Sequence, residues 1–212
     1  LLLNRDKRKR EVAMFRLNMA KVLIIMLVII LFGTISYAES YDIGVYYFPG
    51  WRSNSRYWND LKGIAGSRSP GIPWPDREPL LGYYPEEETW VAEKHIEWAF
   101  RYGIQFFAYD WYWDGKQSPA EHALKAHLNS TNRDKLKFCL LWANHSEVPR
   151  NITEFDAMVD YWILNHFNQK IYYLIEGKPA VFIYSPTQLD QNAQKLGQSG
   201  QSLLARANSK VK

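Results

Sequence analysis

Residues 104–113 read Ile-Gln-Phe-Phe-Ala-Tyr-Asp-Trp-Tyr-Trp. This apolar run is opened by Gly103 and closed by Asp114-Gly115, which predicts a β-strand buried on both faces. The stretch Leu-Leu-Trp-Ala-Asn-His at 140–145 repeats the pattern one strand later. In parallel α/β folds the residues just beyond the strand C-termini line the ligand site. We therefore expect the polar and aromatic residues after these two strands to lie together.

Outward from this strand, strand and helix signals alternate along the chain, which predicts a parallel sheet with right-handed crossovers. After the first strand the chain reads Pro49-Gly50-Trp51-Arg52, so the glycine-rich turn of a nucleotide-binding doubly wound sheet is absent. We therefore predict an α/β fold, a parallel (β/α) barrel of TIM type. Only about four βα units are visible, whereas a closed barrel takes roughly 250 residues, so we expect the N-terminal half of a barrel, truncated at its C-terminus. The predicted strands are 42–49, 104–113, 137–144 and 179–184, and the predicted helices begin at Pro85, Ser118, Ile152 and Pro186.

Local signals define the helices. The first should bury Ala92, Ile96, Ala99 and Phe100, which recur at helical spacing. Ser118-Pro-Ala-Glu121 has the form of a capping box and predicts the start of the second. The composition after Pro186 predicts one weakly amphipathic helix.

The N-terminus is typical of a targeting segment. Residues 1–21 hold seven Lys or Arg and two acidic residues, and the unbroken apolar run Val22–Phe32 follows. Ser36-Tyr37-Ala38 places small residues where a signal peptidase reads them. We predict a signal segment over residues 1–38, cleaved near Ala38, before the truncated barrel domain over 41–212. The protein would then be secreted, periplasmic or at the cell surface; the alternative is an uncleaved membrane anchor.

Charge and cysteine content exclude other classes. Removing residues 1–21 leaves 19 basic against 20 acidic residues, so no basic surface supports a nucleic-acid partner. Cys139 is the only cysteine and lies within an apolar strand, where it is expected to be a buried hydrophobe. Histidine and cysteine spacing indicates no metal site, and we expect no cofactor.

The candidate site residues follow the predicted strands or lie in the first long loop. Indole and phenol rings stack on the apolar faces of sugar rings, whereas Asn and His hydrogen-bond to hydroxyl groups, so the pattern favours a saccharide ligand. Asp110, at the end of a buried strand, is the candidate catalytic acid; the alternative is a buried structural carboxylate. Glycoside hydrolysis usually needs two carboxylates, and no convincing second one is evident. The candidate substrate-binding residues are Trp51, Tyr83, Trp111, Trp113, Trp142, Asn144 and His145.

Five separated motifs resemble the glycoside hydrolase family 99-like proteins, also called the WbsX type, in order and spacing. The resemblance implies a (β/α)₈ barrel, work on carbohydrates and, in the hydrolase family proper, endo-acting cleavage of α-mannosidic linkages. Many WbsX-type proteins carry Glu where this chain has His145, so that Glu has no counterpart here. The family's acidic catalytic segment lies late in the barrel, which implies principal acids beyond Lys212 and a 212-residue chain inactive by itself. The motifs are Ile-Gly-Val-Tyr-Tyr-Phe-Pro-Gly-Trp (43–51), Leu-Gly-Tyr-Tyr (81–84), Tyr-Gly-Ile-Gln-Phe-Phe-Ala-Tyr-Asp-Trp-Tyr-Trp (102–113), Cys-Leu-Leu-Trp-Ala-Asn (139–144) and Gly-Lys-Pro-Ala-Val-Phe-Ile-Tyr (177–184).

Three functions remain open on the sequence. The first is an exported, glycoside hydrolase-like enzyme acting on a polysaccharide or a mannose-containing glycan. The second is a noncatalytic glycan-binding or assembly protein. The third is a WbsX-type glycosyltransferase of polysaccharide biosynthesis, held at the membrane by an uncleaved N-terminal segment.

Overall fold

The computed structural model describes residues 13–24, 26, 41–68, 70–146 and 148–211. The chain divides between Tyr41 and Asp42, and each part is described by itself. In the first part, residues 13–24 and 26 are helical. The predicted cleavage site after Ala38 and most of the run Val22–Phe32 lie outside the described residues. No helix in the described part of the chain is long and apolar enough to cross a membrane.

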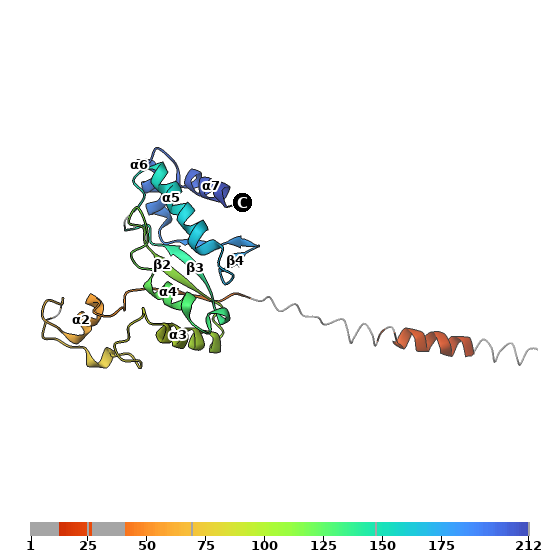
Figure 1. Ribbon diagram of the computed structural model, residues 1–212. Coiled ribbons are helices and arrows are strands. Elements are labelled where there is room, and N and C mark those ends of the chain that lie inside the picture. The colour runs from red at the N-terminus through yellow and green to blue at the C-terminus, as the bar shows by residue number, and fades with distance from the viewer. Residues whose placement is uncertain (1–12, 25, 27–40, 69, 147, 212) are drawn as a thin grey trace, which may run out of the picture. The chain divides into compact units, whose positions relative to one another are not determined.

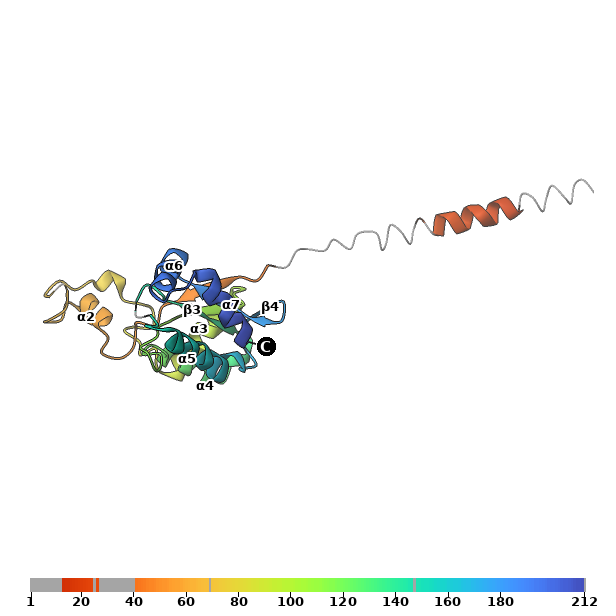
Figure 2. The same cartoon turned by 90° about the horizontal axis from the view of Figure 1, so that it is seen from above.

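The second part is an α/β unit, in which helices pack beside a sheet (Figures 1 and 2). The sheet is parallel and has four strands in the order β1-β2-β3-β6. A two-residue antiparallel pair, β4 with β5, turns through Glu176 and Gly177, which both have positive φ. The strands are β1 (Gly44–Tyr47), β2 (Phe106–Trp111), β3 (Lys137–Trp142), β4 (Leu174–Ile175), β5 (Lys178–Pro179) and β6 (Val181–Ile183). The helices are α2 (Arg56–Lys62), α3 (Thr89–Arg101), α4 (His122–Asn129), α5 (Ile152–Trp162), α6 (Pro186–Lys195) and α7 (Gly200–Lys210). The short helical turns are η1 (Pro75–Arg77), η2 (Arg133–Lys135) and the π-helical η3 (Ile163–Phe167).

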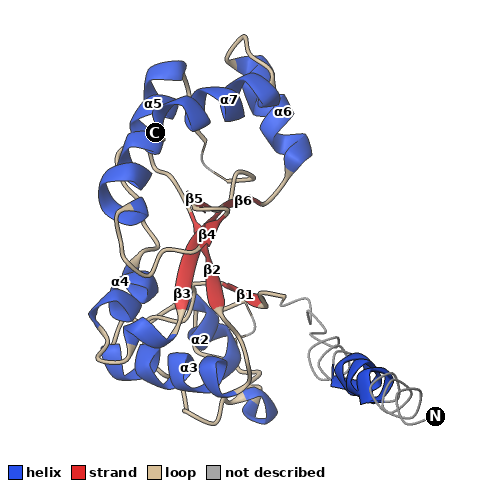
Figure 3. Ribbon diagram, turned by 90° about the vertical axis from the view of Figure 1, so that its right-hand side faces the viewer, coloured by secondary structure: helices blue, strands red, loops and turns tan. Residues whose placement is uncertain are grey.

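The order of the strands distinguishes the two α/β architectures. A doubly wound sheet reverses its strand order at a switch point, whereas a (β/α) barrel adds each new strand beside the previous one. Here each long strand pairs with the next one along the chain, and α3, α4 and α5 follow one another around one side of the sheet (Figure 3). The predicted α/β class, with four units arranged as in half of a (β/α) barrel, is confirmed.

The core lies between the sheet and these helices, because alternate residues of the strands face the helices. From β2, Tyr109 hydrogen-bonds His127 of α4 at 3.0 Å, and Trp111 packs on Trp162 of α5 with ring centroids 5.5 Å apart. α3 buries Ala92, Ile96 and Ala99 as predicted, together with Val91. The expectation for Phe100 is wrong: its side chain is 57% exposed, because it lies one position past the buried stripe.

The structure corrects two predictions about where helices begin and end. α4 begins at His122, four residues after the expected cap, and the Glu121 side chain makes no cap hydrogen bond. Its carboxylate instead accepts hydrogen bonds from groups in the core, so tertiary contacts override the capping-box pattern. The segment after Pro186 forms two helices rather than one, since the chain turns at Gly197 with φ of 67°.

Candidate functional site

Asp110 lies at the C-terminal end of β2 and faces away from the helices. Its neighbours Tyr109 and Trp111 bond to groups on α4 or adjoining it, and successive residues of a strand point to opposite faces. The carboxyl is half-buried, and this desolvation raises its pKa, while the nearby His145 acts in the opposite direction. The structure thus places an acid with a raised pKa at the strand end where (β/α) folds carry their sites.

His145 and Tyr112 lie close enough to this carboxyl to interact with it electrostatically, and further aromatic rings lie beside these two residues. The His145 ring, after β3, lies 4.3 Å from the Tyr184 ring, after β6, centroid to centroid. The Tyr112 ring, two residues after Asp110, lies 6.3 Å from His145 in an edge-on arrangement. Burial, followed by the proximity of Asp110, Tyr57 and Tyr184, raises the pKa of Tyr112 to about 12. We call Tyr57, Asp110, Tyr112, His145 and Tyr184 the strand-end cluster.

The cluster is open to solvent on one side. Tyr184 is 56% exposed, and His145 is exposed beside it. Tyr57 and Tyr112 are partly buried. Rings held in place yet reachable from solvent can stack on a ligand, and a half-buried carboxyl can hydrogen-bond to it.

Asn144 holds together the two loops that carry His145 and Tyr184. It is fully buried, and its side-chain amide forms a closed pair with the Ser185 backbone: Nδ2 donates to Ser185 O at 2.8 Å, and Oδ1 accepts from Ser185 N at 2.9 Å. Asn192 Nδ2 donates to the Asn144 carbonyl at 3.2 Å. Ser185 also caps α6, since its side chain accepts from Gln188 N. Asn144, predicted as a substrate-binding residue, therefore uses its amide to position its neighbour.

Tyr57 reaches the cluster from the long loop between β1 and α3. Its ring lies 5.3 Å from Phe48 and 5.5 Å from Trp51. Trp51 in turn packs on the buried Trp58 at 4.3 Å. Tyr83 lies on another side of Trp58, with the Lys62 ammonium 4.4 Å above its ring. Of the two predicted loop residues, Trp51 contacts the cluster through Tyr57, whereas Tyr83 packs within the loop.

A buried carboxylate, Glu86, fixes the base of this loop. Its Oε1 accepts from Trp51 N at 2.6 Å and lies 2.7 Å from His122 Nε2. The Glu86 side chain is fully buried. The Trp58 indole N–H, shared between the carbonyls of Trp51 and Tyr84 at 2.8 and 3.0 Å, closes the same base. The loop is therefore bonded to the start of α4.

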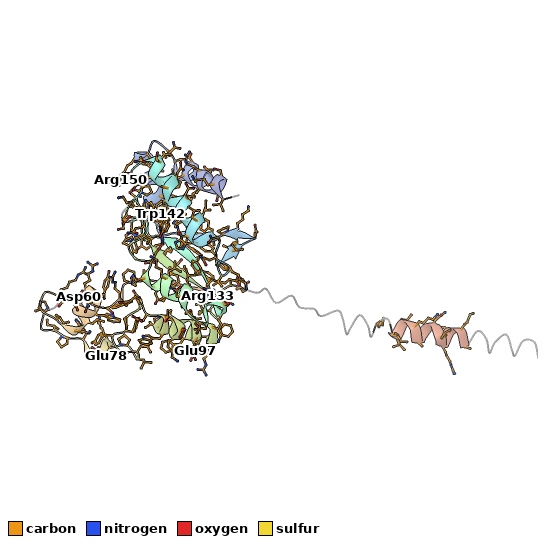
Figure 4. All side chains as sticks on the ribbon, viewed as in Figure 1. Asp60, Glu78, Glu97, Arg133, Trp142 and Arg150 are labelled. Atoms are coloured by element: carbon orange, nitrogen blue, oxygen red, sulfur yellow. The ribbon has the colours of Figure 1, made fainter. Side chains whose placement is uncertain are left out.

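The three remaining predicted tryptophans lie in the core. Trp111 is 1% exposed and stacks on Trp113 at 5.7 Å. Trp142, which is labelled in Figure 4, packs on Trp162 of α5 with ring centroids 5.9 Å apart. The Trp111 indole donates to Glu121 Oε1 at 2.8 Å. The structure therefore places these rings on the helix side of the sheet, apart from the strand-end cluster.

Three members of the cluster were not among the predicted site residues: Tyr57, Tyr112 and Tyr184. Tyr112 could have been found from the alternation of β2, since Asp110 and Tyr112 are two residues apart and point to the same side. Tyr184 could have been found as the residue that ends the fourth strand. The sequence around Tyr57 does not indicate that it joins the cluster, because its position depends on how the long loop between β1 and α3 folds against the strand ends.

Metal and thiol chemistry find no support in these surroundings. Among the described residues, no group of three or more His, Cys, Asp or Glu side chains is arranged to hold a metal ion. Cys139 is buried, and burial raises the pKa of its thiol to about 12, so it stays protonated. Asp114, exposed after β2, accepts hydrogen bonds from the backbone N–H groups of Lys116 and Gln117 and shapes a turn.

The chain is similar in fold to part of several solved structures. Among solved structures, the chain is similar to the GH99 endo-α-mannosidase from Bacteroides thetaiotaomicron bound to bis-tris-propane. The identity is 18% and the TM-score 0.49, over 69% of this chain and 43% of the other. A second structure of that enzyme aligns at 16% identity and a TM-score of 0.48, over 71% and 49%. A glycoside hydrolase-like protein aligns at 16% and 0.44, over 80% and 50%.

The chain thus spans about half of the length of the solved structures that it matches. No curated protein matches it. The family model for glycosyltransferase WbsX matches residues 69–208, which include α3, β2, β3, β6 and four of the five members of the strand-end cluster. The chain therefore belongs to the WbsX glycosyltransferase family.

Proposed function

We propose that the strand-end cluster binds a saccharide and that the protein is an exported, glycoside hydrolase-like member of its carbohydrate-active family. The observation that carries the proposal is the convergence of Asp110, His145 and Tyr184, which come from the ends of three consecutive strands. A sugar ring offers an apolar face to an aromatic ring and hydroxyl groups to a carboxylate and an imidazole. The cluster supplies all three kinds of group.

The surroundings of Asp110 suit proton donation. Burial raises its pKa, so more of the acid keeps its proton in mildly acidic solution. A protonated acid can pass its proton to the oxygen of a glycosidic bond as that bond breaks. Hydrolysis also needs a second carboxylate, roughly 5 to 9.5 Å from the first, that attacks the sugar or activates water. The strand-end cluster holds Asp110 as its one carboxylate, so hydrolysis would require a second acid from outside the cluster.

The presence of one carboxylate in the cluster favours a second candidate, a noncatalytic glycan-binding protein. One acid with three aromatic rings is sufficient for binding a sugar, whereas hydrolysis requires more. A transferase, the activity in the family's description, would need a donor sugar in the same site. Three outcomes distinguish the candidates. A hydrolase releases reducing sugar, a glycan-binding protein binds without turnover, and a transferase consumes an activated donor sugar.

Export is supported by the basic segment and apolar run that precede the barrel part. N-terminal sequencing of protein recovered from the medium or cell envelope would show a new terminus after Ala38. An intact N-terminus on membrane-bound protein would overturn export in a cleaved form and favour the anchored alternative.

The binding proposal is tested with an array of neutral and acidic oligosaccharides that includes α-mannosides. The array compares the full chain with Tyr184→Ala and with Tyr102→Ala, a matched control. Tyr102 is 80% exposed and lies at the C-cap of α3, toward the strand N-termini. We expect Tyr184→Ala to weaken binding about three- to tenfold, the usual worth of one stacked ring, and Tyr102→Ala to bind like the parent. Equal binding by all three proteins, or binding to no saccharide, would overturn the proposal.

A further inference from the structure

Arg56 is an exposed cation beside the strand-end cluster, and two contacts with Tyr57 orient its side chain. It is the first residue of α2, which begins there because the Ser55 side chain accepts a hydrogen bond from Trp58 N. Its Nη2 donates to the Tyr57 hydroxyl at 3.1 Å. Its guanidinium carbon lies 4.9 Å from the centre of the Tyr57 ring. Most exposed arginines sample many rotamers, whereas these two contacts favour one.

Tyr57 ties this cation to the site. The ring that holds Arg56 packs on Phe48, just after β1, and on Trp51. The Tyr57 hydroxyl, which accepts the bond from Arg56, is also close enough to Tyr112 to affect it electrostatically. The exposed guanidinium therefore lies at the Tyr57 side of the cluster.

The charge of Arg56 is not neutralised by the protein. Among the described residues, no carboxylate lies within ion-pair distance of it; Asp60, one turn along α2, interacts with it only at longer range. Asp60 is engaged instead by Arg68, whose backbone N–H donates at 2.7 Å and whose Nε lies 3.9 Å away. Glu87, which also binds this loop, accepts from Ser53 N at 2.9 Å. The guanidinium donors not used by Tyr57 remain available to a ligand.

We infer that Arg56 selects an anionic saccharide, pairing with a carboxylate, sulfate or phosphate group on the sugar that occupies the strand-end cluster. The inference rests on the proposed function and names its substrate class. A guanidinium presents parallel N–H groups that match the two oxygens of such anions. Asp110 repels the same anion, so the acidic group is expected to bind on the Tyr57 side of the cluster.

The test uses an array of uronate-containing, sulfated and phosphorylated oligosaccharides, each with its neutral counterpart, followed by calorimetry on the best pair. The full chain is compared with Arg56→Gln, Arg56→Lys and the control Arg77→Gln. Arg77 lies in the same loop, is exposed and stands 4.3 Å over the ring of Trp74, so it matches Arg56 in charge and setting. The three anion classes on the array identify which group is bound.

We expect the parent to prefer acidic glycans, and Arg56→Gln to weaken their binding about tenfold or more, the worth of one charge-assisted pair. The affinity of Arg56→Gln for the neutral counterparts should stay within twofold of the parent's. Arg77→Gln should bind every glycan like the parent, and Arg56→Lys should bind acidic glycans better than Arg56→Gln but less tightly than the parent. Equal binding of acidic and neutral glycans by the parent would overturn the inference and leave the proposed function standing. If Arg56→Gln lost affinity equally for acidic and neutral glycans, Arg56 would have a structural role and the inference would be overturned. Binding of no glycan at all would overturn both proposals.

Discussion

Replacing Asn144 with alanine should loosen the fold and the site together. The substitution removes two hydrogen bonds, of 2.8 and 2.9 Å, between the amide and the Ser185 backbone. Each is worth about 1 kcal/mol net, and the Ser185 groups left without partners add a desolvation cost that is small because Ser185 is only partly buried. We expect the free energy of unfolding to fall by about 2–3 kcal/mol.

The matched control is Asn192→Ala. It removes the third hydrogen bond of the group, to the Asn144 carbonyl at 3.2 Å, and leaves the pair between Asn144 and Ser185 intact. Its cost should be about 1 kcal/mol. Only Asn144→Ala should also weaken saccharide binding, since it frees the loops that hold the His145 and Tyr184 rings 4.3 Å apart.

Both variants can be measured by urea unfolding at equilibrium, with two-state behaviour checked by fluorescence and circular dichroism. A loss below about 0.5 kcal/mol in Asn144→Ala, within the range of ordinary surface changes, would refute the assigned role of the amide. So would an equal loss in Asn192→Ala. Unchanged saccharide affinity in a destabilised Asn144→Ala would show that the pair supports the fold without positioning the rings.

Three further outcomes follow from the buried and half-buried ionisable groups. Burial lowers the pKa of His127 from 6.5 to about 4. Because the unfolded chain then binds the proton more readily than the folded one, the free energy of unfolding should fall by about 3 kcal/mol between pH 6.5 and pH 4. Urea unfolding across this range should show the loss in the parent and a flatter profile in His127→Gln; parallel profiles would contradict the assignment. Asp110→Asn should weaken saccharide binding yet keep or raise stability at pH 7, because the folded state disfavours the charged carboxyl; a marked loss of stability would reveal a structural acid. Glu121→Gln should cost about 2–4 kcal/mol, because the carboxylate accepts charge-assisted bonds from two core side chains and a third from Tyr161. Lys125→Ala, which removes only its exposed partner 3.6 Å away, should cost less than about 0.5 kcal/mol; equal costs would contradict the role given to the core bonds.

The alternation of strand and helix could be read from the sequence because each element carries its own hydrophobic period. β2 and β3 lie within the predicted ranges, and the helix predicted to begin at Ile152 is present as α5, followed by a π-helical turn. The order of the strands follows from the crossover rule for parallel sheets. These features depend on short-range patterns, which a single sequence displays in full.

The site was harder to predict because its members are brought together by contacts distant in sequence. Asp110 and His145 interact electrostatically, as expected for residues at the C-terminal ends of two neighbouring parallel strands. Trp111 and Trp113 were assigned to the site on residue type, although alternation with Asp110 turns them toward the helices. Glu121 was predicted to cap a helix, but its carboxylate bonds to His166, 45 positions away, a partner that no local pattern indicates.

The buried Glu86 also divides the long loop after β1 into two parts that should respond differently to engineering. The base of the loop, around Trp51, Trp58 and Tyr84, is held together by hydrogen bonds. Farther out, Gly66 and Gly71 have positive φ, and a Cβ added at either would meet nothing within 4 Å. Peptide insertions beside these glycines should therefore be accepted without unfolding the chain, whereas insertions at the base should not. The tip of this loop is a natural attachment point for a tag, a fluorophore or a second binding module.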